Sequence, residues 1–339
     1  MEKLKDNINI ISVIIGTLVG AGFASGKEIY LFFVQYGVVG IIGAAISAIL
    51  TGIIIYATLK IVTKYTIQTN NQFVEKITNK KWGSTIIKNI INIFLLISFW
   101  IMCAGFCTFF KQELGVPTII TACITAIFIY LLLMKNIDGI IKLNTILVPL
   151  MIAIIIYVSI KNNQASTLVF NIENEKIWKS IVSAILYTSY NSITLIPIII
   201  SLKKCSKNQR NLATTIIVTI IIFILIICIF KMLIQTTTNI KNVEIPILTI
   251  LNTYSPSEKI IYAVVIVAAI LTSAISAGYG VLENVKNKSN YKKIAIIICL
   301  LEIPISQIGF GNLVEALYPT FGVVGLLQIV LIFWFAWRG

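Results

Sequence analysis

The chain has 339 residues, of which 58% are hydrophobic and only 12% carry a charge, and its mean hydropathy is +0.95. A soluble protein of this length needs a larger charged fraction to cover its surface, so the composition predicts one membrane-embedded helical bundle. The absence of histidine excludes histidine proton relays, histidine metal sites and Ser-His-Asp catalysis, and the six cysteines have no metal-ligand spacing. No resident cofactor is therefore expected.

Apolar runs long enough to cross a bilayer recur along the whole chain, which is treated as a single transmembrane domain over residues 1–339. The ninth run is short and contains Glu302 and Pro304. The approximate cores of the ten predicted spans, numbered here in chain order, are Ile8–Phe33, Val38–Leu59, Ile86–Phe110, Pro117–Met134, Leu143–Ile160, Trp178–Leu202, Ala213–Leu233, Ile260–Leu282, Ile294–Ile308 and Phe321–Trp337.

The net charge of +14 is assigned to membrane topology rather than to nucleic-acid binding. If the N-terminus is inside, most of the 27 lysines and arginines fall in segments on the cytoplasmic side. Cytoplasmic loops retain positive charge, so both termini are predicted to be cytoplasmic in a multi-pass protein of the cell (inner) membrane.

The spacing of the spans repeats after five spans. Because five is an odd number of membrane crossings, the second copy has the opposite orientation in the membrane. Inverted repeats of this kind are typical of one large class of secondary transporters. The predicted architecture is therefore a five-plus-five inverted repeat, with repeat one at about residues 8–160 and repeat two at about residues 178–338.

Span 1 contains four glycines followed by two charged residues. Glycine weakens a helix, and backbone groups freed inside a bilayer must be buried in protein or line a wet cavity. We therefore expect span 1 to be discontinuous, although two GxxxG pairs would also allow close helix packing. The residues concerned are Gly16, Gly20, Gly22, Ser25, Gly26, Lys27 and Glu28.

Span 6 contains the polar cluster Tyr187-Thr188-Ser189-Tyr190-Asn191 at the position equivalent to the glycine break. These side chains could satisfy an opened backbone or a ligand, so span 6 is also expected to be discontinuous. The alternative is ordinary hydrogen bonding between membrane helices.

Span 8 places the adjacent hydroxyls of Thr272 and Ser273 one turn after the carbonyl of Ala269. Three neutral oxygens on one side could bind a hard cation such as sodium. The alternative is that both hydroxyls bond to the preceding turn of their own helix.

The glycine segment of span 1 and the segment Ala269-x-x-Thr272-Ser273 resemble spans 1 and 8 of the LeuT-like five-plus-five transporters. In that family a sodium ion lies between these two spans, so the resemblance implies sodium as a coupling ion. It also implies that the amides of Ala21 and Gly22 bind an anion. The implied sodium ligands are the carbonyls of Gly16, Val19 and Ala269 and the hydroxyls of Thr272 and Ser273.

More narrowly, the sequence from Gly20 to Ile29, followed by Phe32-Phe33 and Tyr36-Gly37, resembles the YkvI-like membrane proteins. These belong to the amino acid–polyamine–organocation superfamily. The resemblance implies the same transporter fold.

Charged residues suggest a gate and an alternative coupling site. Lys27 and Glu28 follow the glycine break, and with Glu315, which precedes span 10, they are predicted to form or flank an outer gate. Snorkelling to the interface is the alternative. Lys142, near the start of span 5, could replace sodium with a proton-carrying amine, or simply follow the positive-inside rule.

The expected function is secondary active transport of a small solute, an amino acid or a related compound, coupled to sodium rather than protons. A sensor or accessory protein that keeps the fold without transporting is the main alternative, and an enzyme is not expected. The expected partners are a small-molecule substrate and the lipid bilayer, without nucleic acid and with no prediction of oligomeric state. The predicted substrate-lining residues are Gly20, Ala21, Gly22, Phe23, Ser25, Gly26, Tyr187, Ser189, Tyr190 and Asn191.

Overall fold

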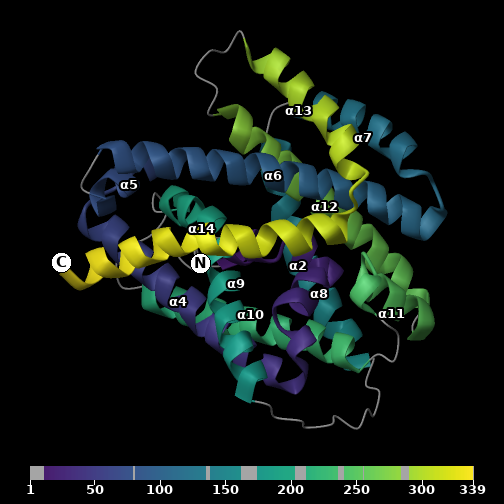
Figure 1. Ribbon diagram of the computed structural model, residues 1–339, viewed down its shortest axis with the longest axis horizontal. Coiled ribbons are helices and arrows are strands. Elements are labelled where there is room, and N and C mark those ends of the chain that lie inside the picture. Colours follow the sequence, from purple (N-terminus) through teal and green to yellow (C-terminus); the bar gives the residue numbers. More distant parts are fainter. Residues whose placement is uncertain are drawn as a thin grey trace, which may run out of the picture.

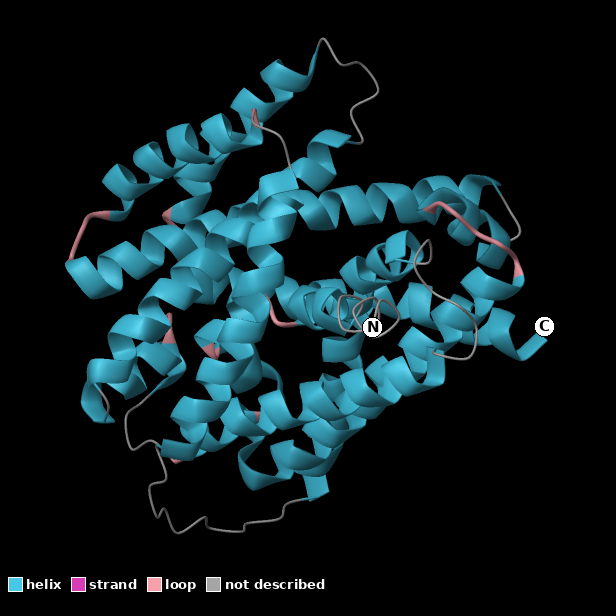
Figure 2. Ribbon diagram, turned by 180° about the vertical axis from the view of Figure 1, so that it is seen from behind, coloured by secondary structure: helices cyan, strands magenta, loops and turns pink. Residues whose placement is uncertain are grey.

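The computed structural model shows a bundle of helices (Figure 1). Seen from behind, the described part of the chain contains no strand (Figure 2). The structure describes residues 11–78, 81–134, 138–161, 174–202, 211–235, 240–254, 256–283 and 290–338.

Helical residues 11–18 precede the first named element. The named helices are α2 (Ala21–Ser25), α3 (Lys27–Phe32), η1 (Val34–Val39), α4 (Gly40–Lys64), α5 (Asn70–Thr78), α6 (Lys81–Leu114), α7 (Thr118–Leu133), α8 (Asp138–Lys161), α9 (Asn174–Leu202), α10 (Asn211–Ile234), η4 (Ile240–Asn242), α11 (Pro246–Tyr254), α12 (Pro256–Glu283), α13 (Tyr291–Ser306) and α14 (Phe310–Arg338).

Each predicted span corresponds to a helix or, for span 1, to a series of short helices. Among the described residues, six helices are long and apolar enough to cross a membrane, namely the helices of spans 2, 3, 6, 7, 8 and 10. The helices of spans 4 and 5 are shorter apolar helices, and α13 is 16 residues long. Large apolar side chains remain exposed on the outside of the bundle, such as Ile124 on α7 (61%) and Ile220 on α10 (52%), as expected for surfaces that face lipid.

Two short helices that were not predicted from the sequence strengthen the repeat. The nine-residue α5 follows α4, and the nine-residue α11 follows α10, so the two short helices are also five spans apart. They lie at opposite ends of the bundle, with α5 beside the C-terminal end of α14 and α11 at the far end (Figure 1). This placement is the one that an inverted second copy requires.

Helix α9 is held between α4 and α14 through glycines. A Cβ atom added to Gly43 of α4 would lie 2.4 Å from the hydroxyl of Ser180, and one added to Gly325 of α14 would lie 2.3 Å from the carbonyl oxygen of Ser189. Small residues let membrane helices approach closely, and this contact places the middle of α9 beside span 1.

The predicted break in span 6 is wrong, because α9 runs continuously from Asn174 to Leu202. Its polar side chains bond to their own helix instead of opening it: the Ser189 hydroxyl donates to the Ile185 carbonyl (2.7 Å) and the Asn191 amide donates to the Tyr187 carbonyl (3.0 Å). Such bonds to the preceding turn satisfy the polar groups while the helix continues. The Thr188 hydroxyl also lies 3.3 Å from the Ser47 carbonyl of α4, which is the interhelical bonding considered as the alternative.

Candidate functional site

The predicted break in span 1 is confirmed. Helical hydrogen bonding stops after the Val19 N–H, which donates to the Ile15 carbonyl (2.7 Å), and resumes where the Ala24 N–H donates to the Gly20 carbonyl (3.0 Å). A second interruption follows at Gly26, whose left-handed φ of 82° separates α2 from α3 and favours glycine. The second half of span 1 is thus two short helices joined by a glycine.

The break frees backbone groups of both polarities. Within the described residues, no backbone partner bonds the carbonyls of Gly16 and Val19 or the amides of Ala21 and Gly22. Free carbonyls at the end of one helical segment attract a cation, and free amides at the start of the next attract an anion. These groups are the backbone atoms assigned to the two kinds of ligand from the sequence.

Helix α12 brings the predicted span-8 hydroxyls to this break. A Cβ atom on Gly20 would lie 3.9 Å from the Ser273 hydroxyl, so Ser273 faces the interrupted segment. The Thr272 hydroxyl is buried and donates to the Ala269 carbonyl (3.1 Å), which matches the alternative of bonding within the helix. Ser273 is therefore the span-8 side chain best placed to share a cation with span 1.

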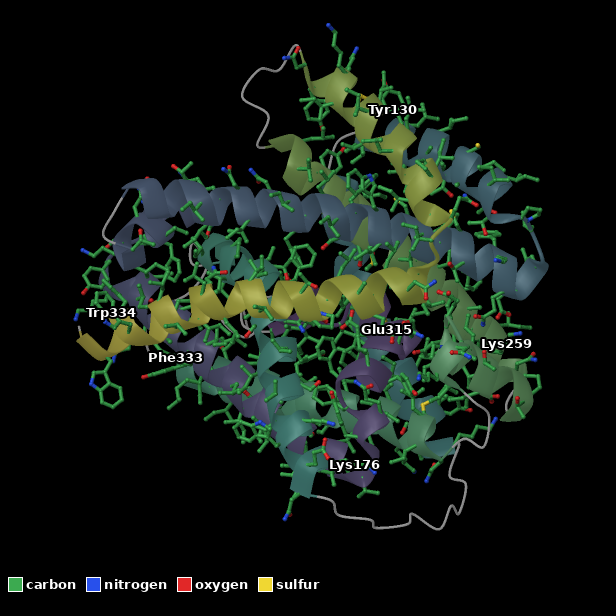
Figure 3. The ribbon with its side chains drawn as sticks, in the orientation of Figure 1. Tyr130, Lys176, Lys259, Glu315, Phe333 and Trp334 are labelled. Atoms are coloured by element: carbon green, nitrogen blue, oxygen red, sulfur yellow. The ribbon has the colours of Figure 1, made fainter. Side chains whose placement is uncertain are left out.

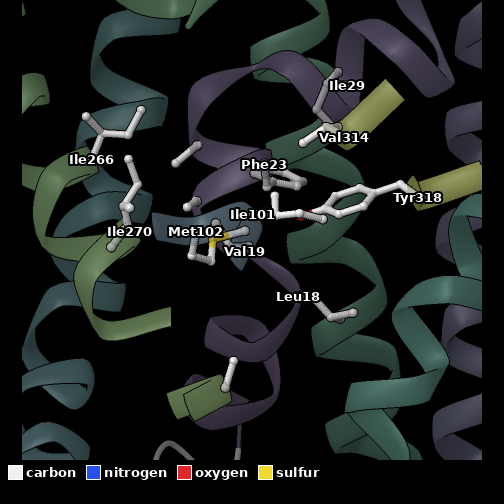
Figure 4. Close-up of a cluster of buried hydrophobic side chains, with 14 of the residues drawn as sticks. Leu18, Val19, Phe23, Ile29, Ile101, Met102, Ile266, Ile270, Val314 and Tyr318 are labelled. Atoms are coloured by element: carbon white, nitrogen blue, oxygen red, sulfur yellow. The ribbon is translucent and has the colours of Figure 1, made fainter. Parts of the chain in front are cut away.

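The surroundings of the break are apolar and tightly packed. Figure 4 shows Val19 and Phe23 of span 1 among side chains such as Met102 of α6, Ile270 of α12 and Tyr318 of α14. Phe23 is fully buried in this core, which excludes water from the freed backbone groups.

The Glu28 carboxylate lies at the centre of the site. Its side chain is 4% exposed and folds back over α2, so that a Cβ atom on Gly22 would lie 1.9 Å from Glu28 Oε1. The Tyr190 phenol of α9 donates a hydrogen bond to Glu28 Oε2. Gly22 therefore makes room for an acidic side chain, a role that its sequence position alone did not reveal.

Aromatic rings cluster around Tyr190, whose phenol donates to this carboxylate. Tyr190 stacks on Tyr318 of α14 (centroids 4.8 Å apart) and on Phe32 (5.5 Å), and it makes an edge contact with Tyr187 (5.5 Å). Tyr187 in turn contacts Phe32 (5.3 Å) and Phe33 (5.0 Å). The predicted residues Tyr187 and Tyr190 are thus brought to span 1, although α9 is not broken.

Lys27 turns away from Glu28 and connects the second half of span 1 to the chain after α10. Its ammonium group is buried (4% exposed) and donates to the carbonyls of Lys241 (2.9 Å) and Val243 (3.3 Å). The Glu244 carboxylate accepts a hydrogen bond from the Gly311 N–H at the start of α14, and Lys27 Nζ lies 3.1 Å from the position of a Cβ on Gly311. These groups join α3, η4 and α14 on one side of the site.

Glu315 makes no direct ion pair with Lys27 within the described structure, although its charge acts on Lys27 at longer range. Its side chain is exposed on α14. Figure 3 places Glu315 and Lys259 in the same half of the molecule, opposite the end that carries Phe333 and Trp334. The outer gate remains a prediction. Of the two acids, Glu244 lies nearer to Lys27 than Glu315 does.

Replacing Lys27 with methionine is expected to loosen η4. Removing the buried ammonium deletes two charge-assisted hydrogen bonds, so amide hydrogen exchange over residues 240–248 should accelerate about tenfold or more. Lys259→Met is the matched control, because Lys259 pairs with Glu113 of α6 (2.6 Å) rather than with η4. Equal exchange in Lys27→Met and the control would contradict the gate.

Two predicted residues have other placements. The Ser25 hydroxyl donates to the Gly22 carbonyl (2.7 Å) and accepts from the Lys27 N–H (3.1 Å), so it shapes the turn at Gly26. Lys142 belongs to α8, but its side chain lies outside the described residues, and its proposed role stays a prediction.

Several site residues were missed from the sequence. Glu244 lies in a connection between spans, where a single acidic residue carries no pattern, although its predicted position on the outer side was a usable signal. Tyr318 and Phe32 lack a spacing that distinguishes them from other membrane aromatics. Tyr262 of α12 donates to the Ala24 carbonyl (2.6 Å), and Ser183 of α9 donates to the Phe32 carbonyl (2.7 Å).

Comparison with solved structures defines the class of fold. The chain superimposes on a mutant form of the manganese transporter from Eremococcus coleocola with a TM-score of 0.61 and 15% identity, covering 96% of this chain and 78% of that one. It also superimposes on a Na⁺-coupled sialic acid symporter in a substrate-bound outward-open state, with a TM-score of 0.58 and 14% identity over 95% and 76% of the two chains. The chain has a LeuT-like fold, as predicted.

Among curated proteins, the chain is 26% identical to the "uncharacterized membrane protein YkvI" of Bacillus subtilis (strain 168), over 97% of this chain and 96% of that protein. It is 24% identical to the protein YyaD of the same organism, over 94% and 93% of the two chains. The resemblance to YkvI that the first span predicted is therefore confirmed and extends over nearly the whole length. No protein-family model matches the chain.

Proposed function

We propose that the protein is a secondary transporter that moves a small solute, an amino acid or a related compound, by alternating access with sodium as the coupling ion. It would act in the cell membrane with both termini cytoplasmic. The proposal does not involve covalent chemistry.

The interrupted first span carries this proposal. It frees backbone carbonyls and amides in the middle of a bilayer-spanning element, next to the Ser273 hydroxyl and the buried Glu28 carboxylate. Exposed backbone polarity at that depth is costly unless a ligand or protein group satisfies it. The likeness to two transporter structures supports the fold on which such a site works.

The described conformation is closed around the site. Glu28, Phe32, Tyr187 and Tyr190 are each 5% exposed or less, and Lys27 ties α3 to η4. A transporter needs such a closed state between states open to either side. Coupling would require that sodium and solute each favour one of these states.

A non-transporting sensor or accessory protein is the second candidate. The observation that favours it is the continuous α9, since the expected transport site has breaks in both repeats. One interruption provides a ligand site but leaves less freedom for one repeat to move against the other.

Uptake into proteoliposomes separates the two candidates. Purified protein should accumulate a radiolabelled amino acid from a mixture of the twenty when an inward sodium gradient is imposed, and should fail to do so with potassium on both sides. Accumulation that is driven instead by a proton gradient would replace sodium as the coupling ion. Sodium-dependent ligand binding without uptake under either gradient would identify the sensor.

A further inference from the structure

We infer that Glu28 is the counter-ion for an ammonium group on the substrate, and that the site accepts amines without a carboxylate. This inference deepens the function proposed above and rests on it. It differs from the expectation that the site holds the substrate mainly by its carboxylate.

Glu28 is a buried acid without a basic partner. Within the described part of the chain, no lysine or arginine forms an ion pair with it, and its side-chain hydrogen bond comes from the neutral Tyr190 phenol. The neighbouring Lys27 is engaged with the Lys241 and Val243 carbonyls. An ionised carboxylate inside a membrane protein is costly without a partner charge, and none of the described side chains supplies one, so a substrate ammonium group would stabilise the ionised form.

The rings around Glu28 suit a cation. Tyr187, Tyr190, Tyr318 and Phe32 form a continuous cluster beside the carboxylate, with successive ring centroids 4.8 to 5.5 Å apart. Aromatic faces attract ammonium groups, and the attraction increases when water is excluded. A carboxylate with several aromatic rings is a recurring way of recognising an ammonium ion.

Other ligand classes fit less well. No group of three or more Cys, Asp or Glu side chains in the described structure is placed to hold a metal ion. A substrate carboxylate that approached Gly22 would meet Glu28 Oε1, which lies 1.9 Å from the position of a Cβ on that residue. Two ionised carboxylates in close contact repel each other in a dry site. An anion would therefore bind only after Glu28 had moved.

Amines, acids and amino acids with the same side chain show whether the site recognises the ammonium group or the carboxylate of a substrate. We would use purified full-length protein in detergent with phenethylamine, 3-phenylpropionate and phenylalanine, and with butylamine, pentanoate and norvaline. A ligand that binds the native state raises its apparent melting temperature by mass action. At least one of the two amines should raise it, and neither simple acid should.

Variants then test the residue. Glu28→Gln should weaken amine binding at least about tenfold, because it removes the charge but keeps the shape. Glu28→Asp, which keeps the charge, should retain part of the binding. Glu175→Gln is the matched control, since Glu175 is an exposed acid at the start of α9 that pairs with Lys179. The melting temperature of each variant without ligand reports whether it folds.

The outcomes distinguish this inference from the proposed function. If an acid binds and no amine does, or if no probe binds, the ammonium assignment is overturned. The same holds if a folded Glu28→Gln protein binds the amine as tightly as the control. Uptake of an acid with no effect of Glu28→Gln would leave the transporter proposal standing. Conversely, amine binding that requires Glu28, without uptake under any ion gradient, would uphold the assignment and contradict transport.

Discussion

Replacing Ser273 with alanine is expected to shift the sodium dependence of ligand binding and uptake to much higher sodium concentrations. The Ser273 hydroxyl is the span-8 side chain that faces the break at Gly20, where the carbonyls of Gly16 and Val19 have no backbone partner among the residues that the structure describes. Losing one of about five oxygen ligands should weaken sodium binding by a factor of about ten or more, because hard cations depend on a complete oxygen shell. The measurement is the thermal shift as a function of sodium concentration, with choline as the replacement cation.

Two comparisons sharpen this result. Ser276→Ala removes an exposed hydroxyl from the same helix and should leave the sodium response unchanged. The thermal shift of the double variant Thr272→Ala, Ser273→Ala should respond to sodium no more strongly than that of Ser273→Ala alone. A Ser273→Ala protein that keeps a normal sodium response would show that the ion, if there is one, binds elsewhere.

Replacing Gly325 with alanine should markedly lower the stability of the protein. The added methyl group would lie 2.3 Å from the Ser189 carbonyl oxygen and 2.7 Å from its carbon, and both belong to the backbone of α9. A backbone cannot rotate away as a side chain can, so α14 and α9 must separate. We expect a cost of about 1–3 kcal/mol, as for other overpacked contacts, and a lower melting temperature.

The same substitution should also reduce uptake, because α14 carries Tyr318, which stacks on Tyr190 beside Glu28. Val323→Ala is the control: it changes an exposed side chain on the same helix and should have little effect. If the Gly325→Ala and Val323→Ala proteins melt at the same temperature, the close contact between α9 and α14 is not as described.

The fold and half of the site could be predicted from the sequence. Long apolar runs indicate membrane helices, and a series of glycines indicates a weak helix. The helical bundle and the break in span 1 could therefore be predicted from the sequence. The break in span 6 was inferred from polar residues, which lower helix propensity but do not by themselves interrupt a helix. Ser189 and Asn191 bond to the preceding turn of α9. The sequence alone does not show whether a polar side chain bonds to its own helix or satisfies an opened backbone or a ligand.

Boundaries and partners across the bundle were less accessible. Helix α14 begins at Phe310, eleven positions before the predicted core, because Asn312, Glu315 and Pro319 lower the apolar signal of its first turns. The short helix α5 is polar on one side and buries Phe73 on the other, so it lacks the long apolar run that identifies a span. The contact between Glu28 and Tyr190 joins residues 162 positions apart, and nothing local in the sequence indicates it.

The adjacency of Lys27 and Glu28 has a consequence for how the molecule would work. Both belong to the six-residue α3, which is bounded at its start by the left-handed Gly26 and is short enough to swivel as one piece. Glu28 reaches inward to Tyr190, and Lys27 reaches the Lys241 carbonyl in η4. A ligand that binds Glu28 would therefore also move Lys27 and the segment η4 that Lys27 holds. Ligand binding and closure would be coupled through the six residues of α3.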